Sequence, residues 1–131
     1  MEQHLIADIP VKAMIVKDGK VLITLDRKWE LPGGRINVGE TPEETLHREL
    51  REELGIEVQI LNLYHVFIRT SERSEQVHFT VVYHCVLKDE TPFQPDKKEI
   101  QDFRWISKDD DLDAIPFFPG YPETLRKFFQ K

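Results

Sequence analysis

The sequence predicts an α/β (α+β) fold in which helices pack against a mixed β-sheet. Three observations predict it: an apolar hairpin pattern opens the chain, a well-capped amphipathic helix follows, and long apolar segments precede a second amphipathic helix. A chain with this order buries its apolar faces by layering helices on a sheet. The 131 residues suit one compact domain, 1–131, and leave no room for two.

The opening segment, residues 11–25, reads VKAMIVKDGKVLITL and predicts two strands. Asp18-Gly19 at its centre is a dipeptide that two-residue hairpin turns favour. Residues 28–40, KWELPGGRINVGE, contain Pro32 and three glycines, so we expect a loop there.

Signals at both ends mark the next segment as a helix. Thr41 is a good N-cap, Pro42 fits the first helical position, and Glu44 completes a Thr-x-x-Glu capping box. Gly55 supplies the stop. An apolar stripe runs along this helix beside a stripe of carboxylates, and it is formed by Leu46, Leu50 and Leu54. We therefore expect one helix face to pack on the sheet while its neighbour lines a cleft.

The rest of the chain predicts more strands and a last helix. Residues 56–68 and 77–87 are apolar enough for strands, and the polar residues 69–76 between them predict a loop or bend. DFRWIS, residues 102–107, predicts a short strand. Pro122 opens a helix over residues 122–131, in which Leu125, Phe128 and Phe129 have core-facing spacing.

Composition and charge restrict the function classes. A net charge of -6 argues against binding of nucleic-acid polymers through the general field of the protein, although a bound metal can reverse the local sign for a small anion. The single cysteine, Cys85, lies in an apolar run and predicts a buried, reduced thiol. No signal-peptide pattern or membrane-length apolar run occurs, so we expect a cytoplasmic protein without a membrane partner.

Three carboxylates share one face of the predicted helix. Glu49, Glu52 and Glu53 stand at i, i+3 and i+4, where like charges repel each other. They offer oxygen donors with no sulfur and no histidine on that face, and hard divalent cations such as Mg²⁺ prefer this ligand set. The alternative interpretation is a solvated helix face paired with Arg48 and Arg51.

A longer pattern surrounds these acids. From Gly34 to Ile56 the sequence reads Gly, five residues, Glu40, seven residues and then Arg-Glu-Leu-Arg-Glu-Glu-Leu-Gly-Ile. This pattern resembles the signature box of the Nudix hydrolases (MutT-like), with all nine fixed positions filled. The preceding WELPGG and the later EIQDFRWIS, residues 99–107, are also similar to family segments. The resemblance implies a Nudix-type α/β/α sandwich with a mixed sheet.

The resemblance also implies an activity. Nudix hydrolases are metal-dependent pyrophosphohydrolases that cleave a nucleoside diphosphate linked to another group, X, by attack of water at phosphorus. Their cofactor is Mg²⁺ or Mn²⁺. Carried over to this chain, the metal ligands would be Glu49, Glu52, Glu53 and the backbone carbonyl of Gly33.

Other roles follow from the same resemblance. Arg48 would orient a glutamate through a salt bridge, and Glu40 would tie the loop to the helix. Glu99 is the candidate acid from outside the box, either as a metal ligand or as the group that deprotonates water. Glu52, Glu53 and Glu99 are all candidates for the general base.

Substrate contacts are less marked in the sequence. Arg27, just before the loop, is a candidate for holding a substrate phosphate, and an exposed basic residue beside Lys28 is the alternative. Two further groups of residues have a ligand-binding alternative: Arg69 and Arg73 flank the cleft-side loop in some layouts, and Phe117, Phe118 and Tyr121 have rings that can stack on a base. We expect surface or packing roles for all five. The default substrate is a small nucleoside di- or triphosphate or a nucleotide sugar, bound by a monomer or homodimer.

Two other function classes are compatible with a Nudix-like fold. A catalytically silent ligand-sensing or binding domain usually has eroded box glutamates, whereas all of them are present here. A diphosphate isomerase is disfavoured by the short chain and by the position of Cys85 in an apolar strand.

Overall fold

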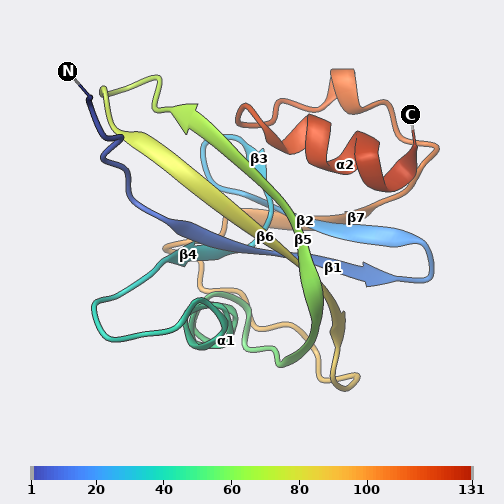
Figure 1. Ribbon diagram of the computed structural model, residues 1–131. Coiled ribbons are helices and arrows are strands. Elements are labelled where there is room, and N and C mark those ends of the chain that lie inside the picture. Colours follow the sequence, from blue (N-terminus) through green and yellow to red (C-terminus); the bar gives the residue numbers. More distant parts are fainter. Residues whose placement is uncertain (1, 131) are drawn as a thin grey trace.

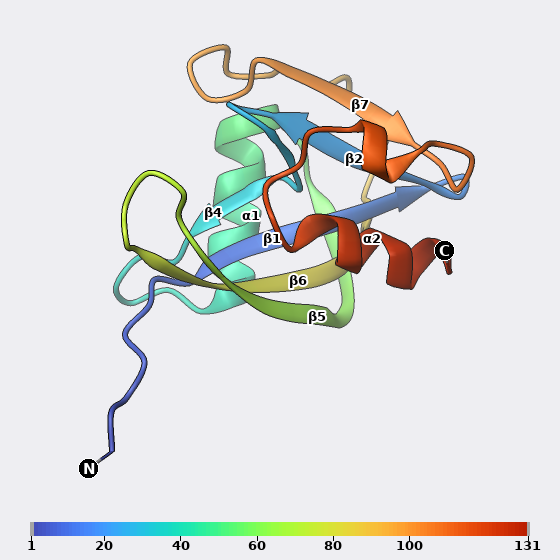
Figure 2. The same cartoon turned by 90° about the horizontal axis from the view of Figure 1, so that it is seen from above.

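A mixed β-sheet with helices on both faces forms the body of the molecule (Figures 1 and 2). The structure is a computed structural model that describes residues 2–130. Its elements are β1 (Pro10–Lys17), β2 (Lys20–Leu25), β3 (Trp29–Glu30), β4 (Gly33–Arg35), α1 (Pro42–Leu54), β5 (Val58–Thr70), β6 (Val77–Leu87), β7 (Asp102–Ile106), a 3₁₀ turn (Leu112–Ala114) and α2 (Tyr121–Phe129).

Strand β1 lies at the centre of the sheet. Along one of its edges it pairs with different strands at its two ends. Within residues 2–130 seven strands form the sheet, with the path β3-β2-β1-β6-β5. Strand β1 runs parallel to β6, whereas its first residues pair antiparallel with β4 and its last residues pair antiparallel with β2. Strand β7 adds to the other side of β2. The short strand β4 thus pairs with β1 and also contacts helix α1.

Alternation along β1 builds one core on each face of the sheet. Val11, Ala13 and Ile15 point to the side on which α1 buries its leucine stripe. Met14 points to the opposite side, where it joins Tyr121 and Leu125 of α2. The predicted three-layer arrangement, with a mixed sheet between helices, is therefore present.

Most predicted elements form where the sequence places them. Asp18 and Gly19 adopt φ values of 53° and 75°, as a two-residue hairpin turn between antiparallel strands requires. Helix α1 has the Thr41 N-cap, the reciprocal capping box and a left-handed Gly55 at its end. Cys85 is fully buried, as predicted.

Several boundaries differ from the prediction, and strand β5, for example, begins at Val58 instead of Ile56. Residues 28–40 are not wholly a loop, because β3 and β4 form within them by pairing with β2 and β1. Strand β5 continues through Arg69 and Thr70, where the sequence suggests the start of a loop. Helix α2 begins at Tyr121, one residue before Pro122, and the predicted last residue of that helix, Lys131, lies outside the described residues.

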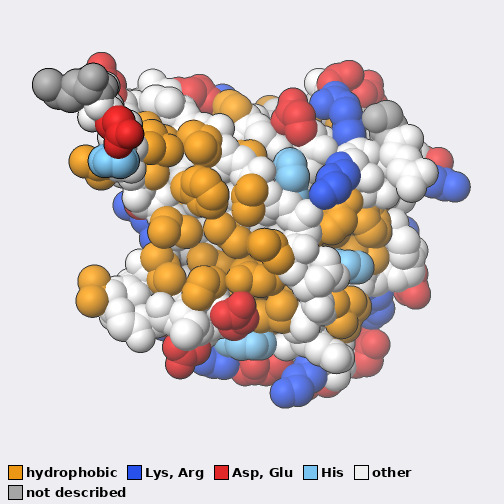
Figure 3. Space-filling model, viewed as in Figure 1, with side chains coloured by type: hydrophobic (Ala, Val, Ile, Leu, Met, Phe, Trp, Pro, Cys, Tyr) orange, Lys and Arg blue, Asp and Glu red, His pale blue; other side chains and the backbone are white. Residues whose placement is uncertain are grey.

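Strand β5 ends the sheet and carries apolar side chains on its outer surface. Figure 3 shows a broad hydrophobic area on the face where β5 and β6 lie in Figure 1. The exposed large apolar residues of β5 are Leu61, Leu63, Val66 and Ile68. Register shifts in the β5–β6 pairing interrupt the regular alternation of this strand.

Among the helices of residues 2–130, none combines the length and the apolar character that crossing a membrane would demand.

Candidate functional site

Two glycines bring strand β4 into close contact with both β1 and helix α1. Gly33 pairs with Lys12 and has a φ of 137°, and a Cβ there would lie 2.1 Å from the carbonyl oxygen of Val11. A Cβ at Gly34 would lie 2.4 Å from the carboxyl carbon of Glu49. A larger residue at Gly33 would clash with the backbone of β1, and one at Gly34 would have to displace the Glu49 carboxylate. The glycine pair therefore lets the strand backbone lie directly against a helix carboxylate.

Arg48 joins three carboxylates of the loop and helix. Its Nη1 donates to Glu49 at 2.9 Å and to Glu52 at 3.2 Å. Its Nε and Nη2 donate to the two oxygens of Glu40 at 2.7 Å and 3.0 Å. These contacts are the ones that the expected positioning role of Arg48 requires.

Glu40 accepts further hydrogen bonds from the loop and from the first turn of the helix. The backbone N–H of Asn37 and the hydroxyl of Thr45 both donate to its Oε1 at 2.9 Å. The hydrogen bonds from Arg48 and Asn37 lower the pKa of Glu40 to about 2. Glu40 therefore fixes the loop that follows β4 to helix α1.

Glu53 is the buried member of the acidic group. It is 5% exposed, and its Oε2 has no hydrogen-bond partner within residues 2–130. Burial raises the pKa of Glu53 to about 9; the ammonium of Lys12 opposes this shift and the carboxylate of Glu49 adds to it. A buried carboxyl oxygen without a partner is costly, so this atom is suited to a ligand that the polypeptide does not supply.

Beside Glu53 lies a buried ion pair that the sequence reasoning missed. Lys12 of β1 is 7% exposed and donates to Glu30 at 3.0 Å and to the carbonyl oxygen of Gly33 at 3.2 Å. The hydroxyl of Tyr121 also faces Glu30, at 3.5 Å. Burial lowers the pKa of Lys12, but Glu30, Tyr121 and Glu53 raise it more, so the side chain is an ammonium ion.

Glu99, the acid predicted from outside the box, lies in the segment between β6 and β7. Its pKa is raised, first by partial burial and then by the negative charges of Glu49, Asp96 and Glu52. The tertiary structure therefore brings Glu99 within electrostatic range of two box carboxylates that are far from it in sequence.

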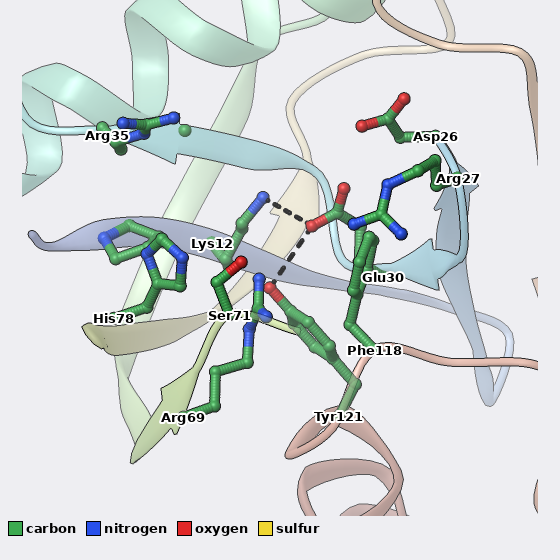
Figure 4. Close-up of a pocket in the computed structure, with 12 residues that line it drawn as sticks. Lys12, Asp26, Arg27, Glu30, Arg35, Arg69, Ser71, His78, Phe118 and Tyr121 are labelled. Carbon is green, nitrogen blue, oxygen red and sulfur yellow. Dashed lines mark hydrogen bonds and ion pairs between the residues drawn. The ribbon is translucent and has the colours of Figure 1, made fainter. Parts of the chain in front are cut away.

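A pocket of about 270 Å³ opens next to this acidic group (Figure 4). Gly34 lines the pocket on one side and contacts Glu49 on the other, so the two sites share a wall. The guanidinium groups of Arg27 and Arg69 lie 5.1 Å and 4.9 Å from the ring centre of Phe118, in cation–π contact. The cationic lining residues are Lys12, Arg27, Arg35 and Arg69, and the carboxylates among the lining residues are Asp26 and Glu30.

Several pocket residues were assigned other roles from the sequence. Arg69 was expected to be a surface residue of a loop, but β5 extends past it and directs it into the pocket, where its Nε is buried without a hydrogen-bond partner among residues 2–130. Phe118 and Tyr121 are packed in the core, as expected, and also line the pocket. One feature of the sequence could have marked Lys12 as a functional residue, because it interrupts an otherwise apolar strand pattern.

The donor types in the acidic group fit a hard divalent cation. Within residues 2–130 no group of three or more His, Cys, Asp or Glu side chains is arranged so that it could hold a metal ion by itself. Oxygen donors are nevertheless adjacent, with the unpartnered Oε2 of Glu53 buried and the carboxylate of Glu49 against Gly34. Mg²⁺ sites in proteins commonly keep waters and are completed by substrate phosphates, so an open arrangement of this kind is suitable.

Comparison with known proteins identifies the family. The family model for the NUDIX domain matches residues 10–128. The chain belongs to the Nudix family. The 8-oxo-dGTP diphosphatase of Escherichia coli (strain K12) is 38% identical to this Nudix chain over 100 residues, which are 76% of this chain and 73% of the relative.

Solved structures show the same fold. A UDP-X diphosphatase matches 98% of this Nudix chain and 66% of its own chain, with 26% identity and a TM-score of 0.74. The MutT protein from Methanosarcina mazei Go1 matches 95% of this chain and 94% of its own, with a TM-score of 0.80 and 22% identity, and at that identity it supports the fold alone. The predictions of a Nudix fold and of an enzyme that acts on phosphoric anhydride bonds are therefore confirmed.

Proposed function

We propose that this Nudix hydrolase is a Mg²⁺- or Mn²⁺-dependent enzyme that cleaves a nucleoside diphosphate linked to a group X. One observation carries the proposal: the buried, unpartnered carboxyl oxygen of Glu53 lies in an acidic group that shares the wall of Gly34 with a cationic pocket. An acidic group suits a cation, and a cationic pocket suits phosphates. A diphosphate bound across the shared wall would contact both.

The metal would be held by Glu49, Glu52, Glu53, Glu99 and the carbonyl oxygen of Gly33. When bound, it would neutralise charge on the diphosphate and align it with water for attack at phosphorus. Arg48 would act as a positioning residue, because its hydrogen bonds hold two of these glutamates.

Two features favour Glu53 among the three candidates for the general base. Its Oε2 has no hydrogen-bond partner among residues 2–130 and is available to accept a proton, and burial keeps the carboxyl group away from bulk water. Glu52 is largely exposed, with 59% of its side chain accessible, and it is held by Arg48. Glu99 is exposed and lies outside the helix, so it would serve better as a further ligand.

Substrate recognition would involve Arg27 and Arg69. Their guanidinium groups flank the aromatic ring of Phe118 and present donors for phosphate oxygens or for carbonyl groups of a base. The similarity to an 8-oxo-dGTP diphosphatase and to a UDP-X diphosphatase supports a nucleotide-type substrate. We take small nucleoside triphosphates and nucleotide sugars as the first classes to test.

The test is a panel of nucleoside di- and triphosphates, including 8-oxo-dGTP, and of nucleotide sugars, each incubated with Mg²⁺ or Mn²⁺. We expect metal-dependent release of a mononucleotide together with phosphate, pyrophosphate or phosphorylated X. Glu53→Gln removes the charge with little change of shape, and it should lower kcat by about a hundredfold or more.

The matched control is Glu57→Gln, which makes the same chemical change in the short connection between α1 and β5. Glu57 pairs only with Arg51, at 3.4 Å, among the ion pairs of the described residues, and it should keep wild-type turnover. Equal turnover by Glu53→Gln and wild type would remove Glu53 from the mechanism. Ligand binding without turnover of any substrate would instead indicate a silent binding domain.

A further inference from the structure

The buried lysine of strand β1 occupies an unexpected position for a site that is proposed to bind a divalent cation. Its ammonium donates to the carbonyl oxygen of Gly33 at 3.2 Å, the same atom that is proposed as a metal ligand. The Lys12 side chain is only 9% exposed, so water screens its charge weakly. A positive charge of the protein itself is therefore in contact with one of the oxygens proposed to bind the cation.

The negative partner of Lys12 does not cancel this charge at the Gly33 carbonyl. Glu30 accepts from the ammonium at 3.0 Å and forms an ion pair with it. The ammonium is in direct contact with the carbonyl oxygen of Gly33, at 3.2 Å, whereas a carboxylate and a carbonyl oxygen are both acceptors and repel each other at such a distance. The nearer charge at this oxygen is therefore positive, and it opposes an incoming cation.

The same lysine also has a supporting role for the site. A carbonyl oxygen has two lone pairs, so Gly33 can accept from Lys12 and still offer an oxygen to a second group. The antiparallel pairing of Lys12 with Gly33 fixes the two residues opposite each other on β1 and β4. The ammonium thus holds the glycine carbonyl when no cation is bound, at the expense of affinity for that cation.

We propose that Lys12 is a positioning residue that fixes the Gly33 carbonyl and keeps the affinity of the free site for a divalent cation low, so that the cation binds strongly only together with an anionic diphosphate. This inference rests on the proposed function. The negative charge of a bound diphosphate would offset the Lys12 charge, because Lys12 also lines the adjoining pocket. Cation and substrate would therefore bind cooperatively.

The test measures Mn²⁺ affinity by electron paramagnetic resonance of the free ion, with and without imidodiphosphate as a non-hydrolysable probe. Lys12→Gln combined with Glu30→Gln removes both charges but keeps hydrogen-bonding groups at both positions. Without the probe, this double variant should bind Mn²⁺ about tenfold more tightly than wild type, whereas Glu30→Gln alone should bind it more weakly. With imidodiphosphate, the difference between wild type and the double variant should shrink.

The matched control is a second ion pair, made by another lysine of β1 with a glutamate that follows β6. Lys17 and Glu90 lie 2.9 Å apart near the surface, so Lys17→Gln with Glu90→Gln makes the same change away from the site and should leave Mn²⁺ affinity unchanged. The measurements are repeated at two pH values, because protons compete with Mn²⁺ for the carboxylates, and the same order of affinities is expected at both. Circular dichroism checks folding, and Lys12→Met with Glu30→Met provides an apolar replacement for the ion pair if the glutamine pair does not fold.

The inference would be overturned if the double variant bound Mn²⁺ no more tightly than wild type. A weaker affinity than that of wild type would mean that Lys12 only supports the Gly33 carbonyl. Failure of the proposed function gives a different result. If Glu53→Gln bound Mn²⁺ as tightly as wild type, the proposed metal site would be wrong and the role of Lys12 would be lost with it. If Glu53→Gln lost Mn²⁺ while the double variant gained nothing, only the role of Lys12 would be rejected.

Discussion

Replacing Arg48 with methionine tests whether this side chain organises the acidic group. The guanidinium makes four hydrogen bonds to three carboxylates at 2.7 to 3.2 Å, and the side chain is 24% exposed. Methionine keeps much of the apolar stem and removes the charge and all of these hydrogen bonds. The carboxylates of Glu40, Glu49 and Glu52 would then face one another without a cation.

The expected loss of stability follows from the number of contacts and their partial exposure. A hydrogen bond to a charged group contributes about 1.5 to 3 kcal/mol when buried, whereas an exposed ion pair contributes about 1 kcal/mol or less. Since Arg48 is partly exposed, we take somewhat under 1 kcal/mol for each contact and expect a loss of about 2 to 3 kcal/mol in the free energy of unfolding. For a chain of this length, that corresponds to a fall in Tm of roughly 10 °C.

The assay is urea unfolding followed by tryptophan fluorescence, with kcat measured on the best substrate of the panel. The control is Arg51→Met on the same helix, because Arg51 is 54% exposed and meets Glu57 at 3.4 Å, so it should cost less than about 0.5 kcal/mol. Arg48→Met should also lower kcat by about ten- to a hundredfold through misplaced glutamates. If the two variants were equally stable and equally active, the view that Arg48 organises the site would be refuted.

Three further predictions concern the loop and the pocket. The pKa of Glu40 is lowered from 4.5 to about 2, mainly by its hydrogen bond from Arg48. The contribution of this pKa shift to stability is therefore present above pH 4.5 and is lost as the pH falls from 4.5 to 2. In acid unfolding, Glu40→Gln should lose less stability over that pH window than wild type. Gly34→Ala would place a Cβ 2.4 Å from the Glu49 carboxyl carbon, so it should leave a folded protein by circular dichroism but lower kcat by about tenfold or more; unchanged kcat would contradict the close approach. Arg69→Met should raise KM more than it lowers kcat, because Arg69 lines the pocket and is not among the proposed metal ligands, and a change confined to kcat would argue against a binding role.

Local signals were sufficient for the helix that carries the acidic group. The N-cap, the proline, the capping box and the terminal glycine act within a few residues of one another, so their effect does not depend on the rest of the chain. The spacing of Glu49, Glu52 and Glu53 then follows from helix geometry alone. The same holds for the Asp18-Gly19 hairpin, which is a local turn between adjacent strands.

Elements that depend on distant partners were not visible in the sequence. Strand β4 is only three residues long and forms because residues 10–12 of β1, far from it in the sequence, offer backbone partners. Strand β3 is two residues long and pairs with Thr24 and Leu25 of the neighbouring β2, across a short turn. Their sequence, rich in glycine and proline, indicates a loop when it is read by itself. The predicted strand over residues 56–68 ends too early for a similar reason. Arg69 and Thr70 are polar and suggest a loop, but they pair with β6.

Motifs and short-range spacing were enough to predict the family, the mixed sheet with its capped helix and the acids expected to bind a metal, because each of these depends on residues close together in the chain. The packing of distant segments, by contrast, buries Glu53 with an unpartnered oxygen and places Lys12 beside it. The same packing brings Arg69 into one pocket with Arg27. Burial and electrostatic fields depend on which distant segments pack together, and a pattern of neighbouring residues does not contain that information.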